Sequence, residues 1–482
     1  MSLYTNCNVI YKFKFRDIIY LIIEELSGVL MKIIVCGDGK VGQTISYQLL
    51  KEGHDVVIVD KNAKLINHTT NTMDCLCIQG NAASREVLIE AGAKEADLLI
   101  AVTSTDEVNL LCCLIAKKLG VGHTIARVRN PEYSNEIQHI QSDLGLSMSV
   151  NPESQTATEI ARLLRFPSAI KNDSFAKGRV DLVEFKIKPN SILIGTALKD
   201  LRRVSGVKVL VCAVLRKGKA IIPDGNFVFE EGDKVSITAR PADILLFFMT
   251  IGVPCRKIKN VMITGGGKIA YYLSKILIDL NYNVKIIEMN EEKAKELAFK
   301  LPKATVINAD ATNHAVLLEE GLENTDAMIT LTGIDEENVF LALYANKAGV
   351  KKSIAKVNRI DIEELLSDVG IDSIVAPKKV VSNEITRYVR AMQNSIGSNV
   401  EALTKIINDE VEALEFRVVS TFKKTNIPLK DLHIKSQVLL ACIVRNNKVI
   451  FPDGNEVILP KDNIVVVTTR TGFNDLNDIL ED

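Results

Sequence analysis

Residues from one half of this chain recur in the other half at a nearly constant distance. Gly37 is repeated as Gly265 (265 minus 37 gives 228) and Asp60 as Glu288 at the same offset. Three single residues and one turn recur 229 positions later: Asp97 as Asp326, Thr103 as Thr332, Asn109 as Asn338, and Pro223-Asp224-Gly225 as Pro452-Asp453-Gly454. Chance composition does not keep an offset over so long a stretch, so the chain holds two copies of one unit.

Composition bounds the class of protein. A length of 482 residues predicts three or four domains. Hydrophobic residues make up 47% and charged residues 25%, which is typical of a soluble globular α/β protein. The 59 Lys and Arg nearly cancel the 60 Asp and Glu, and no basic run stands out, so we expect no nucleic-acid partner.

The nine cysteines form no paired framework, as is usual for reduced thiols in a cytosolic protein. Cys75 and Cys77 could suggest a metal site. Strand alternation alone places both on one face, however, and no second cysteine pair or histidine pair completes a tetrahedral ligand set. We therefore interpret them as core residues and predict no metal.

Residues 1–30 lie before the first copy. Their apolar stretch, Ile18 to Ile23, is far shorter than the roughly 20 residues that cross a bilayer, and charged residues flank it. Because Met31 directly precedes a clean first strand, we expect translation to begin there, which would make 1–30 an extension from a misassigned start. A genuine docking helix is the alternative.

The first copy alternates short apolar runs with stretches of helical periodicity. Such alternation predicts a parallel sheet with right-handed crossovers. The expected strands are Lys32–Cys36, Val56–Val59, Cys75–Gln79, Ala96–Val102 and Thr124–Val128, and the clearest helices are Val41–Leu50, Arg85–Ala91 and Asp106–Leu119.

A period of two begins at Val180 and indicates a small, largely β domain. Before it, the amphipathic segment from Glu153 to about Ser174 is predicted to be a helix that crosses between domains or protomers, interrupted at Pro167. The expected division is a first nucleotide-binding domain at 31–152, a crossover helix at 153–176 and a first β domain at 177–253, followed by the same three parts at 258–377, 378–405 and 406–482.

A GxGxxG sequence, Gly37-Asp38-Gly39-Lys40-Val41-Gly42, stands between the first strand and the first helix. In that context Gly37 permits a tight turn, Gly39 leaves room for a pyrophosphate, and Gly42 lets the helix pack close to the strand. The helix start offers free N–H groups and a positive dipole end to phosphate.

Asp60 ends the second predicted strand, 18 residues after Gly42, where an acid hydrogen-bonds ribose hydroxyls. An acid there repels a 2′-phosphate, so NAD(H) is favoured over NADP(H). The pattern therefore predicts a dinucleotide-binding Rossmann-like domain. In the alternative interpretation, Asp60 is a residue of a surface turn.

The second copy carries a degraded form of the same site. It has Gly265-Gly266-Gly267-Lys268-Ile269-Ala270 and ends its second strand at Glu288. Ala270 adds one methyl group at the helix-packing position, which such turns tolerate.

Polar residues at later strand ends are further candidates. Thr103 could contact nucleotide or belong to a loop in which Thr105 or Asp106 caps the next helix. Arg127 and its counterpart Lys356 either face phosphate or are solvated charges at a strand end.

Nothing repeated in the two copies supplies catalysis. A dehydrogenase needs a proton-transfer group and a substrate pocket opposite the nicotinamide, and the six histidines show no repeated placement. Duplicated binding without duplicated catalysis favours regulation. An NAD-dependent oxidoreductase is the alternative. A redox-sensing repressor is a third possibility that the sequence disfavours, because it shows no helix-turn-helix pattern.

Together, the turn at Gly37, Asp60, Gln79-Gly80-Asn81-Ala82, the Thr103–Asn109 loop and Ala126-Arg127-Val128-Arg129 resemble the regulator-of-potassium-conductance (RCK) nucleotide-binding domain. The β domain with Pro223-Asp224-Gly225 resembles its C-terminal partner. The resemblance covers residues 31–482 and implies an α/β chain of two doubly wound Rossmann-like domains, each followed by a small α+β domain.

The resemblance implies a cytosolic, non-enzymatic regulatory subunit of a Trk-type potassium uptake system. NAD+ or NADH, with ATP or ADP as alternatives, would rearrange a ring of such units, a tetramer of tandem chains or a dimer of dimers, on a membrane potassium translocator at the inner face of the cell membrane. The implied nucleotide contacts are Gly37 to Val41, Asp60, Thr103, Ser104 and Arg127 in the first copy, and Gly265 to Ile269, Glu288, Thr332 and Lys356 in the second.

Overall fold

A computed structural model of the chain separates into two units, the first ending at Val150 and the second beginning at Asn151. It describes residues 30–165, 171–175, 180–253, 258–359, 371, 373–395, 400–406, 410–446, 448–470, 472–473 and 475–481. The predicted N-terminal extension, apart from Leu30, therefore lies outside the described residues.

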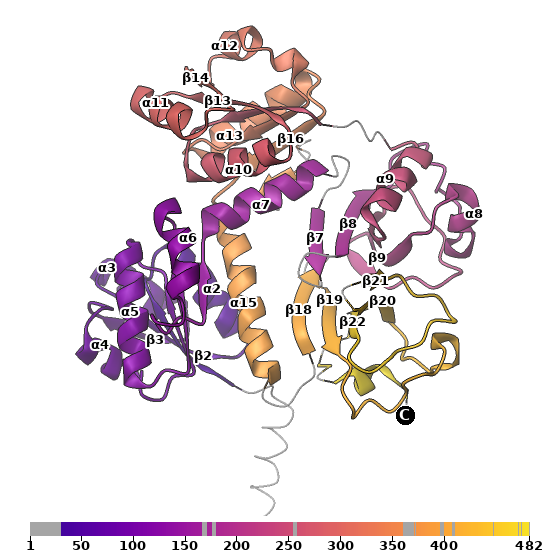
Figure 1. Ribbon diagram of the computed structural model, residues 1–482, viewed down its shortest axis with the longest axis horizontal. Coiled ribbons are helices and arrows are strands. Elements are labelled where there is room, and N and C mark those ends of the chain that lie inside the picture. Colours follow the sequence, from indigo (N-terminus) through magenta and orange to yellow (C-terminus); the bar gives the residue numbers. More distant parts are fainter. Residues whose placement is uncertain are drawn as a thin grey trace, which may run out of the picture. The chain divides into compact units, whose positions relative to one another are not determined.

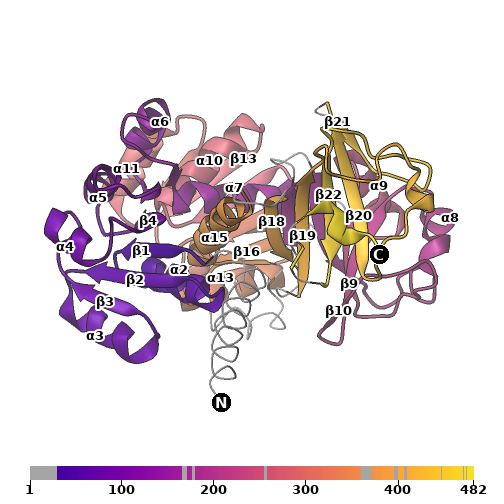
Figure 2. The ribbon, with the colours of Figure 1, turned by 90° about the horizontal axis from the view of Figure 1, so that it is seen from below.

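The first unit is built on a six-stranded parallel sheet with strand order β3-β2-β1-β4-β5-β6 (Figures 1 and 2). This is the strand order of a Rossmann fold, so the predicted doubly wound domain is confirmed. Its elements are β1 (Lys32–Cys36), α2 (Lys40–Lys51), β2 (Asp55–Asp60), α3 (Ala63–Thr72), β3 (Leu76–Gln79), α4 (Arg85–Glu90), β4 (Leu98–Ala101), α5 (Asp106–Leu119), β5 (His123–Arg127), α6 (Pro131–Ile140) and β6 (Met148–Val150).

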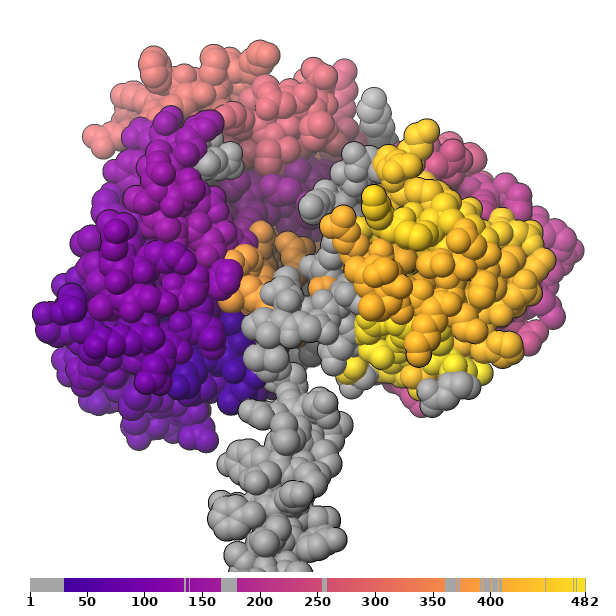
Figure 3. Space-filling view, turned by 60° about the horizontal axis from the view of Figure 1, so that its bottom comes forward, coloured from indigo at the N-terminus to yellow at the C-terminus, as the bar shows by residue number. Residues whose placement is uncertain are grey.

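The strands are buried on both faces, as parallel sheets are. Ile34 and Leu99 share a core with Leu88 of α4 and Cys112 of α5. This unit forms the indigo to purple surface in the space-filling view (Figure 3). Helix α5 carries acids in its first turn and lysines in its last, and it ends at Gly120 in the left-handed region, all of which stabilise the helix.

The second unit opens with α7 and the first β domain. The domain is a five-stranded antiparallel sheet with strand order β10-β9-β11-β8-β7. Its elements are α7 (Pro152–Arg165), β7 (Lys171–Phe175), β8 (Val180–Lys186), η1 (Leu198–Asp200), α8 (Leu201–Ser205), β9 (Leu210–Arg216), β10 (Lys219–Ile221), β11 (Lys234–Thr238) and α9 (Pro241–Thr250).

The prediction of one crossover helix over 153–176 is wrong in its second part. Helix α7 ends at Arg165, and 171–175 form strand β7, which pairs with β8 from Lys171↔Glu184 to Phe175↔Val180. This pairing with a partner strand is a tertiary effect that the local pattern does not reveal.

The second Rossmann domain repeats the first, with strand order β14-β13-β12-β15-β16-β17. Its elements are β12 (Asn260–Thr264), α10 (Lys268–Asp279), β13 (Asn283–Glu288), α11 (Glu291–Lys300), β14 (Thr305–Asn308), α12 (His314–Glu319), η2 (Leu322–Asn324), β15 (Ala327–Thr330), α13 (Asp335–Lys347), β16 (Lys352–Lys356) and β17 (Ser373–Val375).

The second β domain again follows a helix and has strand order β18-β19-β22-β20-β21. The crossover helix predicted at 378–405 is also wrong in its second part, because the helix ends at Ser395 and Val400–Ile406 is a strand. The elements are α15 (Pro377–Ser395), β18 (Val400–Ile406), β19 (Val411–Arg417), η3 (Leu429–Asp431), β20 (Val438–Arg445), β21 (Lys448–Ile450), β22 (Asn463–Thr468) and η4 (Leu476–Ile479).

Contacts within the second unit join parts of both copies. Ile160 and Leu164 of α7 share one core with Leu273 and Leu277 of α10, and Asn151 Nδ2 donates to Tyr272 Oη at 2.9 Å. Helix α7 therefore packs against the first helix of the second Rossmann domain. The two β domains also share a buried cluster.

Candidate nucleotide-binding site

The first glycine turn is shaped by two glycines that admit no side chain. Gly37 has φ +109°, and a Cβ there would lie 2.9 Å from the backbone of Val102 and Thr103. A Cβ on Gly42 would overlap the Gly37 carbonyl oxygen. These glycines bring β1, β4 and α2 together, as the sequence predicts.

Gly39 is different, because a Cβ there would meet no protein atom within 4 Å. The fold therefore does not require glycine at this position, and the space above it is open. A ligand that approaches the backbone gives a physical reason for a glycine here.

Helix α2 begins beside that open space. Gly39 is its N-cap and provides no side-chain cap, and the first turn contains no acid. Lys40 is exposed and Val41 half-buried. The first N–H groups of a helix have no acceptor within it, so this end can bind an anion.

Asp60 is held at the carboxyl end of β2 by two backbone donors. Its Oδ2 accepts from the N–H of Asp38 at 2.7 Å, and its Oδ1 accepts from the N–H of Asn62 at 2.8 Å. The carboxylate is half-buried and fixed next to the glycine turn. A fixed acceptor there suits a ribose hydroxyl.

The side chain of Asp38 lies beneath the turn. It is fully buried, and its Oδ2 accepts from the Thr69 hydroxyl at 2.6 Å. Burial raises the pKa of the Asp38 carboxyl, and the Thr69 hydrogen bond opposes this shift. The sequence grouped Asp38 with the nucleotide contacts, whereas its side chain is directed into the protein.

Thr103 follows β4 and is held by Asn109 of α5. Asn109 Oδ1 accepts from both the N–H and the hydroxyl of Thr103 at 2.7 Å, and its Nδ2 donates to the Arg127 carbonyl at 2.8 Å. Asn109 thus ties the ends of β4 and β5 together at one sheet edge. Sequence reasoning missed this role, although the recurrence of Asn109 as Asn338 was a signal of it.

The alternative in which this loop caps α5 is not what the structure shows. Thr105 is the N-cap residue but makes no side-chain cap. Asp106 instead accepts from the N–H groups of Arg129 and Asn130, both at 2.8 Å.

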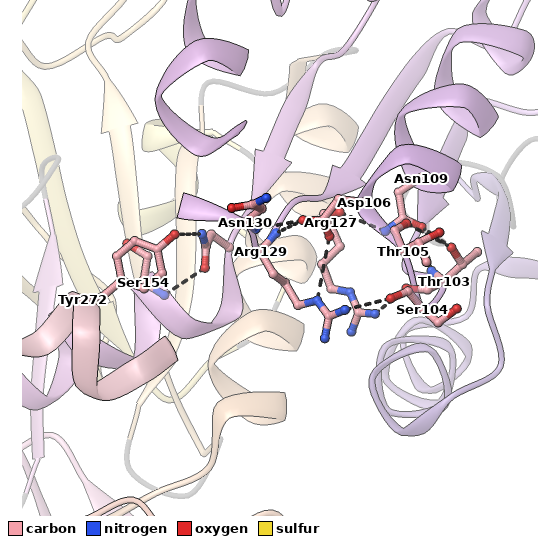
Figure 4. Close-up of polar contacts among 11 residues, drawn as sticks. Thr103, Ser104, Thr105, Asp106, Asn109, Arg127, Arg129, Asn130, Ser154 and Tyr272 are labelled. Atoms are coloured by element: carbon pink, nitrogen blue, oxygen red, sulfur yellow. Dashed lines mark hydrogen bonds and ion pairs between the residues drawn. The ribbon is translucent and has the colours of Figure 1, made fainter. Parts of the chain in front are cut away.

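Two arginines point from the end of β5 toward the same loop (Figure 4). Arg127 Nη2 donates to the Thr103 carbonyl, and Arg129 Nη2 donates to the Ser104 carbonyl at 2.7 Å. Ser104 is exposed. The predicted residues Thr103, Ser104 and Arg127 are therefore brought together. Arg129, which the sequence placed in the resembling motif but not among the nucleotide contacts, is an additional cation at this loop.

The second turn repeats this geometry with different residues. Gly265 has φ +93°, and a Cβ on Gly267 would meet nothing within 4 Å. Gly267 is the uncapped N-cap of α10, and exposed Lys268, half-buried Ile269 and fully buried Ala270 follow. Glu288 accepts from the N–H of Gly266 at 2.5 Å and from the N–H of Asn290 at 2.8 Å.

Lys356 takes the place of Arg127. Its Nζ donates to the Thr332 carbonyl at 2.6 Å, while Asn338 Oδ1 accepts from the Thr332 N–H at 2.8 Å. Burial lowers the pKa of the Lys356 ammonium, and the Asp335 carboxylate opposes that shift.

Within the described part of the chain, no group of three or more His, Cys, Asp or Glu side chains is arranged to hold a metal ion. Cys75 and Cys77 do share one face, with their sulfurs 3.9 Å apart, but both are only partly buried, so the interpretation of them as core residues is wrong. The same ranges include no helix long and apolar enough to span a bilayer.

Comparison with known families decides the membership of the chain. The TrkA-N domain family matches residues 33–152 and 261–377, and the TrkA-C domain family matches 182–252. The chain belongs to the TrkA family. The resemblance inferred from the sequence is thus confirmed for the family, and both glycine turns fall inside the TrkA-N matches.

Two relatives show how far the family likeness extends. A Trk system potassium uptake protein TrkA homolog from Archaeoglobus fulgidus is 33% identical over 436 residues, which cover 90% of this chain and 97% of the relative. The Trk system potassium uptake protein TrkA of Haemophilus influenzae is 31% identical over 440 residues, which cover 90% and 95% respectively.

Solved structures show the same fold. The GsuK RCK domain aligns with a TM-score of 0.60 at 16% identity and covers 91% of this chain and 92% of its own. A GsuK channel bound to NAD aligns with a TM-score of 0.59 at 15% identity over 91% of this chain and 77% of its own. These TrkA-family and RCK likenesses confirm the predicted architecture.

Proposed function

We propose that this chain is a non-enzymatic, nucleotide-binding regulatory subunit of a Trk-type potassium uptake system, with NAD+ or NADH as the ligand of the first site. The open space at Gly39, in front of an uncapped helix start and beside a fixed Asp60 carboxylate, carries the proposal. Membership in the TrkA family supplies the potassium-uptake context.

The residues present fit a dinucleotide. Its pyrophosphate would lie against the first N–H groups of α2, near Lys40 and Val41, where the helix dipole favours negative charge. Asp60 would accept hydrogen bonds from a ribose and repel a 2′-phosphate, which favours NAD(H) over NADP(H). Arg127 and Thr103 would complete the site at the same sheet edge.

The second site keeps the glycine turn and the acid at Glu288, with Gly267 open and Lys356 turned to the Thr332 carbonyl. We propose that it binds an adenine nucleotide as well, with ATP or ADP as alternatives to NAD(H). Its residues from Gly265 to Ile269 would cradle the phosphates.

Regulation would act through a population shift. A ligand moves an equilibrium between two conformations only if its affinities for them differ. We propose that the chain assembles with further copies into a ring at the cytoplasmic face of a membrane potassium translocator. NADH against NAD+, or ATP against ADP, would then bias the conformation of the ring and so the translocator.

A flux assay tests this proposal directly. Rubidium uptake is measured in vesicles that contain a Trk-type translocator, with the full-length chain and each nucleotide on the cytoplasmic side. We expect NADH and NAD+ to give different fluxes, and Gly39→Asp to bind the translocator but lose that difference. Equal flux with all four nucleotides would overturn the regulatory proposal.

The enzymatic alternative has its own readout. A regulator leaves the near-ultraviolet absorbance of NADH constant when candidate small substrates are added. Stoichiometric loss of that absorbance with one substrate would instead support an oxidoreductase.

A further inference from the structure

Two cysteines at the edge of the first Rossmann sheet form a close pair that the nucleotide site does not use. Cys75 and Cys77 flank Leu76 at the start of β3, which is an edge strand. Their sulfur atoms are 3.9 Å apart, and both side chains are only partly buried. The pair therefore lies at the partly exposed edge of the sheet and not in the core.

The other described cysteines do not share these features. Cys36, Cys112, Cys113, Cys212 and Cys442 are all buried. Cys36 and Cys112 also contact each other, but inside the core. Among the described thiols, Cys75 and Cys77 alone combine a close partner with partial exposure.

The fold does not require sulfur at these two positions. The registers of β3 and β14 align Gln79 with Asn308, because Asp60 pairs with Gln79 and Glu288 with Asn308. The second copy therefore has Ala304 in place of Cys75 and Val306 in place of Cys77. Both residues pack against the core of the second sheet, so the pair belongs to the first copy alone.

The geometry suits a bridging atom better than a disulfide. Two residues apart along a strand, Cα atoms are about 6.6 Å apart, near the upper limit of roughly 6.8 Å for disulfides, and the sulfurs would have to close to about 2.05 Å. A soft atom bonded to each sulfur at about 2.3 Å, the thiolate distance of zinc, can bridge two sulfurs as far apart as the present 3.9 Å, whereas a disulfide cannot.

We propose that Cys75 and Cys77 form a chelating dithiol site for a soft, thiophilic centre, either trivalent arsenic or a soft divalent cation such as cadmium. The pair supplies two ligands, and solvent or the incoming group supplies the rest. The site is independent of the proposed nucleotide function.

The chemistry balances without an oxidant. With an aryl arsenic(III) oxide, two As–S bonds form and the As=O bond is broken. The oxygen leaves as water with the two thiol protons, and arsenic stays trivalent. With a divalent cation, the two thiol protons pass to solvent.

The closeness of the two thiols distinguishes chelation from simple alkylation. Cys75 and Cys77 lie 3.9 Å apart, so one chelating reagent can form a bond to each sulfur. A reagent that gains two bonds at once is favoured at this pair over a one-thiol alkylating reagent.

Intact-mass spectrometry of the native full-length chain with one equivalent of phenylarsine oxide tests the site. We expect one arsenical adduct, lost in both Cys75→Ala and Cys77→Val, which copy the residues of the second copy, and kept in the control Cys212→Ser. Thermal melting checks that the variants fold, and the conservative Cys75→Ser and Cys77→Ser replace any variant that does not.

The outcomes separate the possibilities. No adduct on the parent chain, or an adduct that survives in either variant, would overturn the proposal. Loss of two hydrogens on mild peroxide treatment without arsenical binding would also overturn it, because it would show a disulfide switch instead. A titration with cadmium that saturates at one equivalent in the parent, and fails in both variants, would extend the site to the cation.

Discussion

At the scale of single residues, the glycine turns combine groups that serve the fold with groups that leave room for a ligand. Gly37 and Gly42 are required by backbone contacts, whereas Gly39 is not. Beneath the turn, Asp38 is a buried carboxyl whose Oδ1 has no hydrogen-bond partner among the described residues. A buried acid with one unsatisfied oxygen disfavours the ionised form.

Asp38→Asn should therefore change how stability depends on pH. Burial raises the folded-state pKa of Asp38 above its ordinary 3.8, so the protonated form is favoured in the folded state. The stability it contributes is fully present below pH 3.8 and is lost as pH rises through the raised pKa. Between pH 3.8 and the raised pKa, the melting temperature of the parent should fall progressively relative to that of Asp38→Asn. Above the raised pKa, this difference in melting temperature should persist. A melting difference that is the same at every pH would contradict this account.

At the scale of elements, the two turns solve one packing problem in two ways. In the first copy, Asp38 and Thr69 of α3 fill the space under the turn with a hydrogen bond. In the second, Gly266 leaves that space to Leu297 of α11 and the longer Glu288, because a Cβ on Gly266 would lie 2.5 Å from Leu297 Cδ1 and 2.9 Å from Glu288 Oε2. The residues at these three positions are thus matched within each copy.

This matching predicts a rescue. Gly266→Asp alone should destabilise the second Rossmann domain by about 1–3 kcal/mol, because it overpacks the turn and adds a charge next to Glu288. Adding Leu297→Thr and Glu288→Asp should recover most of that loss, since residues in contact are coupled. Thermal melting of the single, double and triple variants measures the coupling. Strictly additive losses would show that the three positions are not matched.

The sequence predicts elements best where the pattern is local. Strand Lys32–Cys36 and helix Asp106–Leu119 fall where the periodicity places them, because caps, charges and apolar spacing agree there. Strand Lys171–Phe175 was predicted as helix because its strand state depends on pairing with β8 rather than on its own residues.

The candidate site also divides into residues that local sequence patterns predict and residues whose place depends on tertiary contacts. The glycine turn, Asp60 and the loop at Thr103 were found from spacing along the chain. The burial of Asp38 could not be predicted from spacing, because it depends on Thr69, which is 31 residues away in a helix that the pattern did not predict. Arg129 carried no repeat signal, since offset 229 places Asn358 there.

At the scale of the whole molecule, each copy places its glycine turn at the start of a helix. In the second unit that helix is α10, whose Leu273 and Leu277 share a core with Ile160 and Leu164 of α7. Helix α7 leads in sequence into the first β domain. We expect a ligand at Gly267 to act on α10 and, through this packed core, on α7.

The central claim is that the start of the first helix in each copy binds the phosphates of a nucleotide. Its most direct test is an equilibrium titration of the full-length chain with NADH, comparing the parent with Gly39→Asp and Gly267→Asp. Gly225→Asp, at an exposed glycine of the first β domain, is the matched control.

An aspartate at either helix N-cap adds a capping acceptor that stabilises the helix by about a few tenths of a kcal/mol relative to glycine, yet it places a negative charge where phosphate would lie. We predict that Gly39→Asp melts no lower than the parent and loses NADH binding at the first site, that Gly267→Asp removes the second site alone, and that Gly225→Asp binds normally. Undiminished NADH affinity and stoichiometry in a folded Gly39→Asp chain would contradict the account.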